Sequence, residues 1–135
     1  MRKNYNTILL IDDDPDDREL LEEAFLNIDV NVIVQPVASV TEAMDYLEQL
    51  AVENLPCLVI IDYEMPELNG VQGLRLICQN DVFKTIPAVV WSTSSFSKCK
   101  EACEEIGSKA YFLKPHNLQD YKSLAREMYS FRTGN

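Results

Sequence analysis

Positive charge is scarce in this chain. Its 12 lysine and arginine residues are outnumbered by 22 aspartate and glutamate residues, and the formal net charge is −10. A protein that binds nucleic acid needs a basic face for the phosphates, and an anionic membrane surface makes the same demand. The composition therefore argues against both nucleic acid and a membrane as partners.

The sequence also lacks the residue patterns of a zinc site. It has one histidine and four cysteines, and no two cysteines form a C-x-x-C pair. Structural zinc sites are usually built from cysteine and histidine at such short spacings. We expect instead reduced thiols that face the core of a cytosolic protein. These are Cys57, Cys78, Cys99 and Cys103.

Long apolar runs are absent as well. A transmembrane helix needs about 20 consecutive apolar residues, and no run in this sequence approaches that length. The stretch ILLI at 8–11 is too short for a signal-peptide core and leads directly into acidic residues. The chain has 135 residues and no linker, repeat or low-complexity tract, which is the size of one ordinary domain. We therefore expect a single cytoplasmic domain over residues 1–135.

The chain does contain a regular alternation of apolar runs and amphipathic stretches. Proline at 15, the S-x-x-E pattern from 39 to 42 and glycine at 107 are typical of helix ends. Strands that are apolar throughout are usually buried on both faces, so the pattern predicts an α/β fold with a doubly wound parallel five-stranded sheet. The predicted strands are 7–11, 30–37, 57–61, 86–91 and 109–113, and the predicted helices are 15–28, 39–50, 69–79, 96–106 and 117–131.

Polar groups follow four of these predicted strands. Asp12 and Asp13 follow the first, Asp62 the third, Ser92 the fourth and Lys114 the fifth. Ligands of an open α/β sheet bind beyond the carboxyl ends of its strands, where we expect these side chains to converge. Two unit charges about 4 Å apart repel by roughly 4 kcal/mol at an effective dielectric constant of 20, so the acids need a cation or a proton.

The chemistry of this set favours phosphoryl transfer to a carboxylate. An all-oxygen site open to solvent suits Mg²⁺. Lys114 and Ser92 could both donate hydrogen bonds to a phosphoryl oxygen, and a carboxylate beside them is a reasonable acceptor. Bland interpretations remain for single residues, because an aspartate after a strand could simply cap the next helix. We expect Asp14 to take that capping role.

Four segments together resemble the receiver domain of two-component response regulators, the CheY-like family. They are ILLIDDDP (8–15), LVIIDYEMPELNG (58–70), IPAVVWST (86–93) and AYFLKP (110–115). Their order makes the resemblance specific, as do the 30 and 52 residues that separate Asp62 from Ser92 and Lys114. It extends over about residues 5–130 and implies a flavodoxin-like (βα)5 fold with strand order 2-1-3-4-5.

The resemblance implies a phosphoacceptor and a Mg²⁺ site. Asp62 matches the aspartate that receives the phosphoryl group. Asp12 and Asp13 match the acidic pair that holds Mg²⁺ together with Asp62. Glu64 matches the position whose backbone carbonyl is a further metal ligand.

It also implies a switch. Ser92 matches the hydroxyl residue that moves toward the phosphoryl group, and Tyr111 matches the aromatic residue that rotates with it. Lys114 matches the lysine that contacts a phosphoryl oxygen, and Gly70 matches the glycine that closes the loop after the third strand. Ser92 stands where threonine is commoner and Thr93 where alanine is usual, so the phosphoryl lifetime stays open.

The function implied is that of a single-domain response regulator without an output domain. It would take a phosphoryl group from a phosphohistidine of a histidine kinase or phosphotransfer protein. It would then signal to a downstream protein, as monomer or homodimer, through a phosphorylation-dependent surface change. It would be no enzyme beyond catalysing its own aspartyl phosphorylation and dephosphorylation.

Three alternatives remain from the residues themselves. A small Mg²⁺-dependent phosphatase would use the same aspartyl phosphate, with Glu64 as proton donor, but 135 residues leave no room for a lid domain. An FMN-binding protein would need a phosphate loop where this chain has acid. A calcium loop from residue 12 would need glycine where Asp17 stands.

Overall fold

The computed structural model describes residues 6–94 and 97–134 as five successive βα units. The parallel sheet has the strand order β2-β1-β3-β4-β5, as predicted. Its strands are β1 (Thr7–Ile11), β2 (Ile33–Val37), β3 (Leu58–Asp62), β4 (Ala88–Ser92) and β5 (Tyr111–Leu113). The helices are α1 (Pro15–Ile28), α2 (Val40–Glu48), α3 (Gly70–Cys78), α4 (Ser97–Ile106) and α5 (Leu118–Tyr129).

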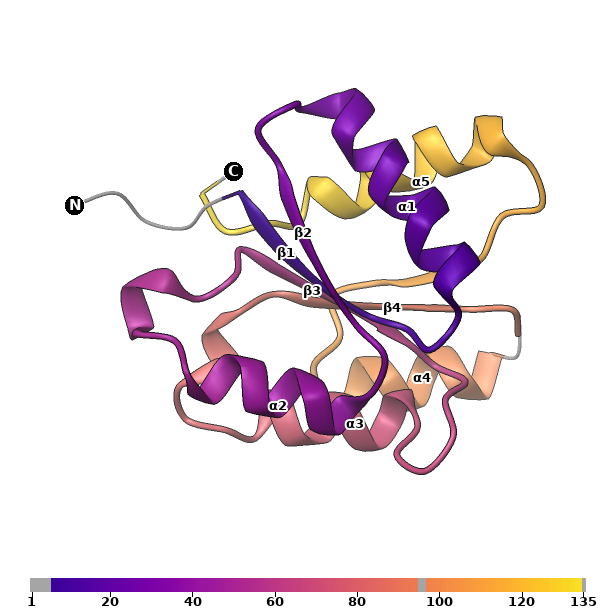
Figure 1. Ribbon diagram of the computed structural model, residues 1–135. Helices are drawn as coiled ribbons and strands as arrows, with labels where there is room; N and C mark the ends of the chain where they lie inside the picture. Colours follow the sequence, from indigo (N-terminus) through magenta and orange to yellow (C-terminus); the bar gives the residue numbers. More distant parts are fainter. Residues whose placement is uncertain (1–5, 95–96, 135) are drawn as a thin grey trace.

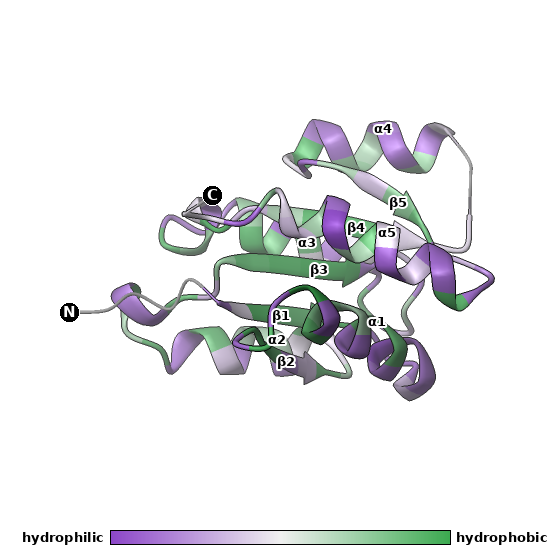
Figure 2. Cartoon of the chain, turned by 90° about the horizontal axis from the view of Figure 1, so that it is seen from above, coloured by the Kyte–Doolittle hydropathy of each residue, from purple (hydrophilic) through white to green (hydrophobic). Residues whose placement is uncertain are grey.

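Helices cover both faces of the sheet. Figure 1 shows α1 and α5 side by side on one face, and α2, α3 and α4 on the other. The three central strands are coloured as strongly hydrophobic in Figure 2, and all residues of β1, β3 and β4 are buried. A strand between two helical layers has no solvent face, which explains why its sequence does not alternate.

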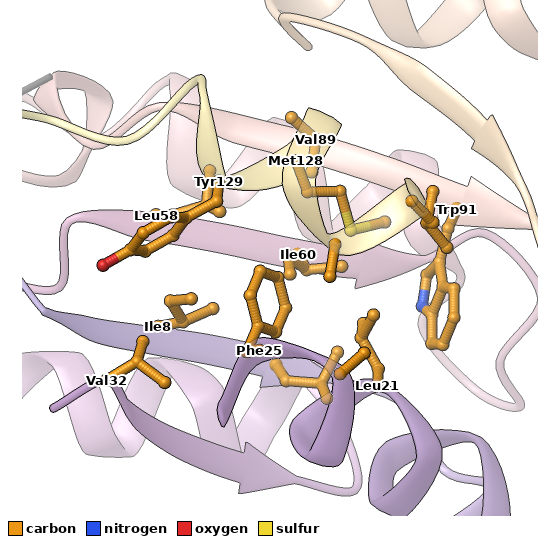
Figure 3. Packing of buried hydrophobic residues seen from close by; sticks show 14 of the residues in the cluster. Ile8, Leu21, Phe25, Val32, Leu58, Ile60, Val89, Trp91, Met128 and Tyr129 are labelled. Carbon is orange, nitrogen blue, oxygen red and sulfur yellow. The ribbon is translucent and has the colours of Figure 1, made fainter. Parts of the chain in front are cut away.

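Two hydrophobic clusters fill the spaces between the layers. The cluster under α1 and α5 is shown in Figure 3, where Phe25 of α1 lies near Ile60 of β3 and Met128 of α5 approaches Trp91 of β4. The cluster on the other face joins β1, β3 and β4 to α2, α3 and α4. The central strands are held between these two clusters, and their carboxyl ends carry the polar residues of the site.

The edge strands differ from the prediction. β2 begins at Ile33 rather than at residue 30, and Ile33 is 54% exposed. β5 begins at Tyr111 rather than at residue 109, and its residues are half-buried or exposed. An edge strand has a neighbour on one side only, so less of its apolar surface is covered.

Two central strands and four helices also differ from their predicted bounds, by one or two residues, whereas β1 and α1 have the predicted bounds. β3 starts after Cys57 and includes Asp62, while β4 starts at Ala88 and includes Ser92. Short 3-10 turns at Val52–Asn54 and Phe83–Thr85, which periodicity did not predict, precede these two strands. Residues 5 and 96, at the starts of the predicted core and of one predicted helix, lie outside the described residues.

Side-chain caps hold the first turns of α1, α2, α3 and α5. Asp14 accepts hydrogen bonds from the backbone N–H groups of Asp16 and Asp17 at the start of α1, so the predicted capping role of Asp14 is confirmed. Ser39 Oγ accepts from Glu42 N in α2. Asn69 and Gln72 form a reciprocal capping box at α3, which the sequence reading missed.

Candidate functional site

Three carboxylates meet where β1 and β3 end. One oxygen each of Asp12, Asp13 and Asp62 lies within 4.8 Å of the others. Asp12 is completely buried and Asp62 is 2% exposed, whereas Asp13 is exposed. Backbone N–H groups fix the two buried acids, since Asp14 N donates to Asp12 Oδ1 at 2.8 Å and Glu64 N donates to Asp62 Oδ1 at 3.0 Å.

Lys114 brings a positive charge into this acidic group from the end of β5. Its Nζ lies 2.9 Å from Asp12 Oδ2, 2.9 Å from Asp17 Oδ2 and 3.3 Å from Asp62 Oδ2. The same ammonium lies 4.8 Å from the centre of the buried Trp91 ring. Its side chain is 9% exposed, so a charge in this place depends on its acidic partners.

Burial and mutual repulsion make the acids hard to ionise. Burial, reinforced by the Asp12 charge, raises the pKa of Asp62 to about 7 even though Lys114 opposes the shift. Burial likewise raises the pKa of Asp12 above its ordinary value. Burial alone would lower the pKa of Lys114, but its contacts with the Asp17 and Asp12 carboxylates outweigh burial, raise the pKa and keep the lysine charged. The site therefore lacks enough positive charge to balance its carboxylates, and a bound cation would supply it.

The Glu64 side chain is exposed, and its carboxylate is bonded to the next loop. Its Oε1 accepts from Thr93 N at 3.0 Å, and its Oε2 accepts from Thr93 Oγ1 at 2.6 Å. Burial alone would raise the pKa of Glu64, but the hydrogen bonds from Thr93 prevail and lower it. Thr93, noted from the sequence only as a departure from the family pattern, thus ties the β3–α3 loop to the β4–α4 loop.

The predicted switch residues lie beside this tie. Ser92 is fully buried, and its Oγ accepts from Ser94 N at 2.9 Å. Tyr111 is half-buried, and its hydroxyl donates to Ser94 O at 2.8 Å. Its ring packs edge-on against Tyr63, with centroids 6.2 Å apart. Ser92 and Tyr111 therefore both bond to residue 94, at the start of the segment that leads into α4.

Gly70 is required by close approach rather than by an unusual backbone angle. A Cβ at this position would lie 2.6 Å from Tyr63 Cα and 2.8 Å from Asp62 O. Gly70 N donates to Tyr63 O at 3.0 Å, which closes the loop that carries Glu64. The glycine thus keeps α3 against the end of β3.

The site residues fit a hard divalent cation. Carboxylate oxygens are the preferred ligands of Mg²⁺ and Mn²⁺, and the three acids provide them at one point. Asp12 Oδ2 is buried, with no hydrogen bond among the described residues to satisfy it beside its ion pair with Lys114. The Glu64 carbonyl, which the family resemblance implies as a further ligand, lies in the same turn as the Asp62 carboxylate, to which Glu64 N donates.

Comparison with known proteins decides the family. The model of the response regulator receiver domain matches residues 8–126. The chain belongs to this family. The order of motifs noted in the sequence and the strand order of the sheet both agree with that assignment, and the flavodoxin-like fold is confirmed.

Individual relatives carry the same description. The receiver domain is 30% identical over 122 residues to the response regulator Rre1 of Synechocystis, covering 90% of this chain and 51% of Rre1. This chain therefore spans about half the length of that relative. Receiver domains of this family interact with histidine kinases or phosphotransfer proteins. The family assignment therefore does not favour the phosphatase alternative.

Two solved structures resemble the receiver domain over nearly its full length. The phosphorylated cyanobacterial phytochrome response regulator RcpA superposes with a TM-score of 0.84 at 28% identity, covering 96% of this chain and 95% of that one. The Mn²⁺-bound response regulator Rcp1 gives a TM-score of 0.80 at 28% identity, covering 93% of each chain. One relative of this fold thus carries a divalent metal and the other a phosphoryl group.

The four cysteines are free thiols. Cys57 and Cys103 are buried in the two clusters, and Cys78 is half-buried and packs against the cluster under α2, α3 and α4, as expected; Cys99 is half-buried. No helix in the described part of the receiver domain is long and apolar enough to cross a membrane. The sequence indicated no role for Asp17 or Trp91, yet both contact the ammonium of Lys114.

Proposed function

We propose that Asp62 accepts a phosphoryl group from a phosphohistidine of a histidine kinase or phosphotransfer protein. The observation that carries this proposal is the position of its carboxylate. Asp62 ends a buried central strand, 3.3 Å from a buried lysine and within a group of three acids. No packing requirement explains why a chain would place acids in such a costly environment.

The transfer is an exchange of one bond for another. An Asp62 carboxylate oxygen attacks the phosphorus and forms the new O–P bond as the P–N bond to the histidine breaks. The imidazole, which carries a proton on its other ring nitrogen, leaves as neutral imidazole. Lys114 Nζ and the Ser92 hydroxyl can donate to the phosphoryl oxygens once they arrive. Asp12, Asp13, Asp62 and the Glu64 carbonyl would hold Mg²⁺, which supplies positive charge against the negative charge of the transferred group.

Phosphorylation would change the surface around α4, β5 and α5. Ser92 and Tyr111 both bond to residue 94, so a movement of Ser92 toward a phosphoryl group disturbs the start of α4. A two-state element of this kind lets a local charge bias a distant surface. We propose that a downstream protein binds that surface in the cytoplasm. The receiver domain would act as a monomer or homodimer. It would catalyse only its own phosphorylation and dephosphorylation.

Intact-protein mass spectrometry after incubation with acetyl phosphate tests the proposal. We expect one phosphoryl adduct that requires both Mg²⁺ and Asp62, so that Asp62→Asn and a sample with EDTA remain unmodified. Beryllofluoride binding provides a second readout where small phosphodonors react slowly. An adduct of equal yield on Asp62→Asn would refute the assignment, and turnover of a generic phosphate ester would favour the phosphatase instead.

A further inference from the structure

Lys114 has one acidic partner that belongs to no metal-binding group. Asp12 and Asp62 are members of the carboxylate cluster, but Asp17 is not. Asp17 lies in the first turn of α1, and its Oδ2 accepts a hydrogen bond from Lys114 Nζ at 2.9 Å. The two residues are 97 positions apart in the chain, so this contact joins α1 to the loop after β5.

The contact is well placed to orient the ammonium. An ammonium has three N–H donors, and Lys114 has three carboxylate partners among the described residues. The indole ring of Trp91 limits its movement from another side, 4.8 Å away. The contact with Asp62, at 3.3 Å, is the longest of the three, and it is the one that a phosphoryl group on Asp62 would replace.

Cation binding would leave Asp17 as the remaining partner. Asp12 and Asp62 would share their oxygens with a divalent ion at the cluster, and both acids would then bind Lys114 less strongly. Asp17 is outside the cluster, and its side chain is 24% exposed, so it keeps its hydrogen bond to the ammonium. Charge-assisted hydrogen bonds of this kind are among the stronger contacts of a side chain.

We infer that Asp17 is a positioning residue that holds the Lys114 ammonium toward Asp62 for contact with a phosphoryl oxygen. This inference rests on the proposed function of the site. It also predicts an effect opposite to that of simple electrostatics. Removing a negative charge near a phosphoryl site should favour an incoming anion, whereas removing the residue that orients Lys114 should weaken the binding of that anion.

The test compares Asp17→Asn with Asp16→Asn. Asp16 is the neighbouring acid in the same helical turn, it is exposed, and it is not among the described ion-pair partners of Lys114. Both substitutions remove one charge from the start of α1. The probes are beryllofluoride in the presence of Mg²⁺, and Mg²⁺ alone, each followed by the fluorescence of Trp91, the one tryptophan of the chain.

We expect Asp17→Asn to weaken beryllofluoride binding about fivefold to tenfold, less than the full value of a charge-assisted hydrogen bond because Asp17 acts on the anion only through Lys114. Mg²⁺ binding should stay within about twofold of wild type, and Asp16→Asn should leave both affinities within about twofold. Equal or tighter beryllofluoride binding by Asp17→Asn would overturn the inference. Thermal melting of each variant shows that it is folded.

A double-mutant cycle with Lys114→Ala identifies the route of the effect. If Asp17 acts through Lys114, Asp17→Asn should cause no further loss of beryllofluoride affinity in the Lys114→Ala background. An equal loss in both backgrounds would overturn the positioning role. A wild-type protein that takes neither beryllofluoride nor a phosphoryl group would overturn the proposed function and this inference together, whereas normal wild-type binding with an unaffected Asp17→Asn overturns the inference alone.

Discussion

At the scale of single residues, the protein accepts a local cost at its site. Asp62 and Asp12 are buried and close together, and burial raises the pKa of each carboxyl group. The single ammonium of Lys114 has to compensate for both of these carboxylates and for that of Asp17 as well. Buried charges that are only partly compensated are typical of functional sites rather than of stable cores.

The raised pKa of Asp62 predicts a pH-dependent cost of folding. The pKa is about 7 in the folded state against an ordinary value of 3.8, so the folded state binds the proton more tightly than the unfolded state. The contribution of this group to stability is therefore fully present below pH 3.8 and is lost as the pH rises through about 7. In EDTA at pH 8, Asp62→Asn should raise the free energy of unfolding by roughly 1–3 kcal/mol.

Thermal and urea unfolding at pH 5 and pH 8 would measure this gain. It should shrink at the lower pH, because wild-type Asp62 is then mostly protonated. Asp16→Asn serves as the control, since it removes the same charge from an exposed position. A stabilisation by Asp62→Asn of equal size at both pH values would contradict the titration assigned to this carboxyl group.

At the scale of elements, several contacts that shape the site are made by the loops that follow the strands. Thr93 bonds Glu64 across two loops, and Glu67 in the first of them has a positive φ of 64°. A residue other than glycine in this conformation stores a small strain. The β3–α3 loop is held in place at its end by Gly70 and by the capping box of α3.

Gly70→Ala should therefore destabilise the protein and displace this loop. The added Cβ would meet backbone atoms of Tyr63 and Asp62 at 2.6 and 2.8 Å, and backbone cannot turn aside as a side chain can. Overpacking of this kind typically costs about 1–3 kcal/mol. Denaturant unfolding would measure the loss, with Arg75→Ala on the exposed side of α3 as the control. A Gly70→Ala variant as stable as Arg75→Ala would show that the loop has room to move.

At the scale of the whole molecule, charge sets the response to ions. The net charge of −10 means that any cation relieves some general repulsion, whereas the cluster of Asp12, Asp13 and Asp62 could hold one cation specifically. The two contributions differ in their dependence on concentration, because a specific site saturates and general screening follows ionic strength.

Millimolar Mg²⁺ should raise the melting temperature more than NaCl of the same ionic strength. A ligand that binds the folded state alone stabilises it by RT ln(1 + [L]/Kd), about 2.7 kcal/mol at a concentration 100 times Kd. Asp12→Asn should abolish the extra rise, since it removes a buried member of the cluster. Differential scanning calorimetry gives the measurement, and identical melts in Mg²⁺ and matched NaCl would count against the metal site.

The sequence by itself determined the order of the elements and the residues at the strand ends. A run such as TILLI followed by acid can be recognised as a strand with a site at its end. A strand covered on both faces is apolar, whereas the site residues that follow it are polar. Their alternation sufficed to predict the parallel sheet, and the family resemblance implied its strand order; the structure has both. It also sufficed to predict that Asp12, Asp13, Asp62 and Lys114 share one edge, where the structure brings them together.

Only the tertiary structure decided which of these side chains touch. The contact of Asp17 with Lys114 joins residues 97 positions apart, and that of Glu64 with Thr93 joins residues 29 apart. Hydrophobic periodicity places each residue on a face of its own element. The distance between two elements depends on sheet twist and on how α1 and α5 pack together, which are properties of the assembled core and not of any local segment.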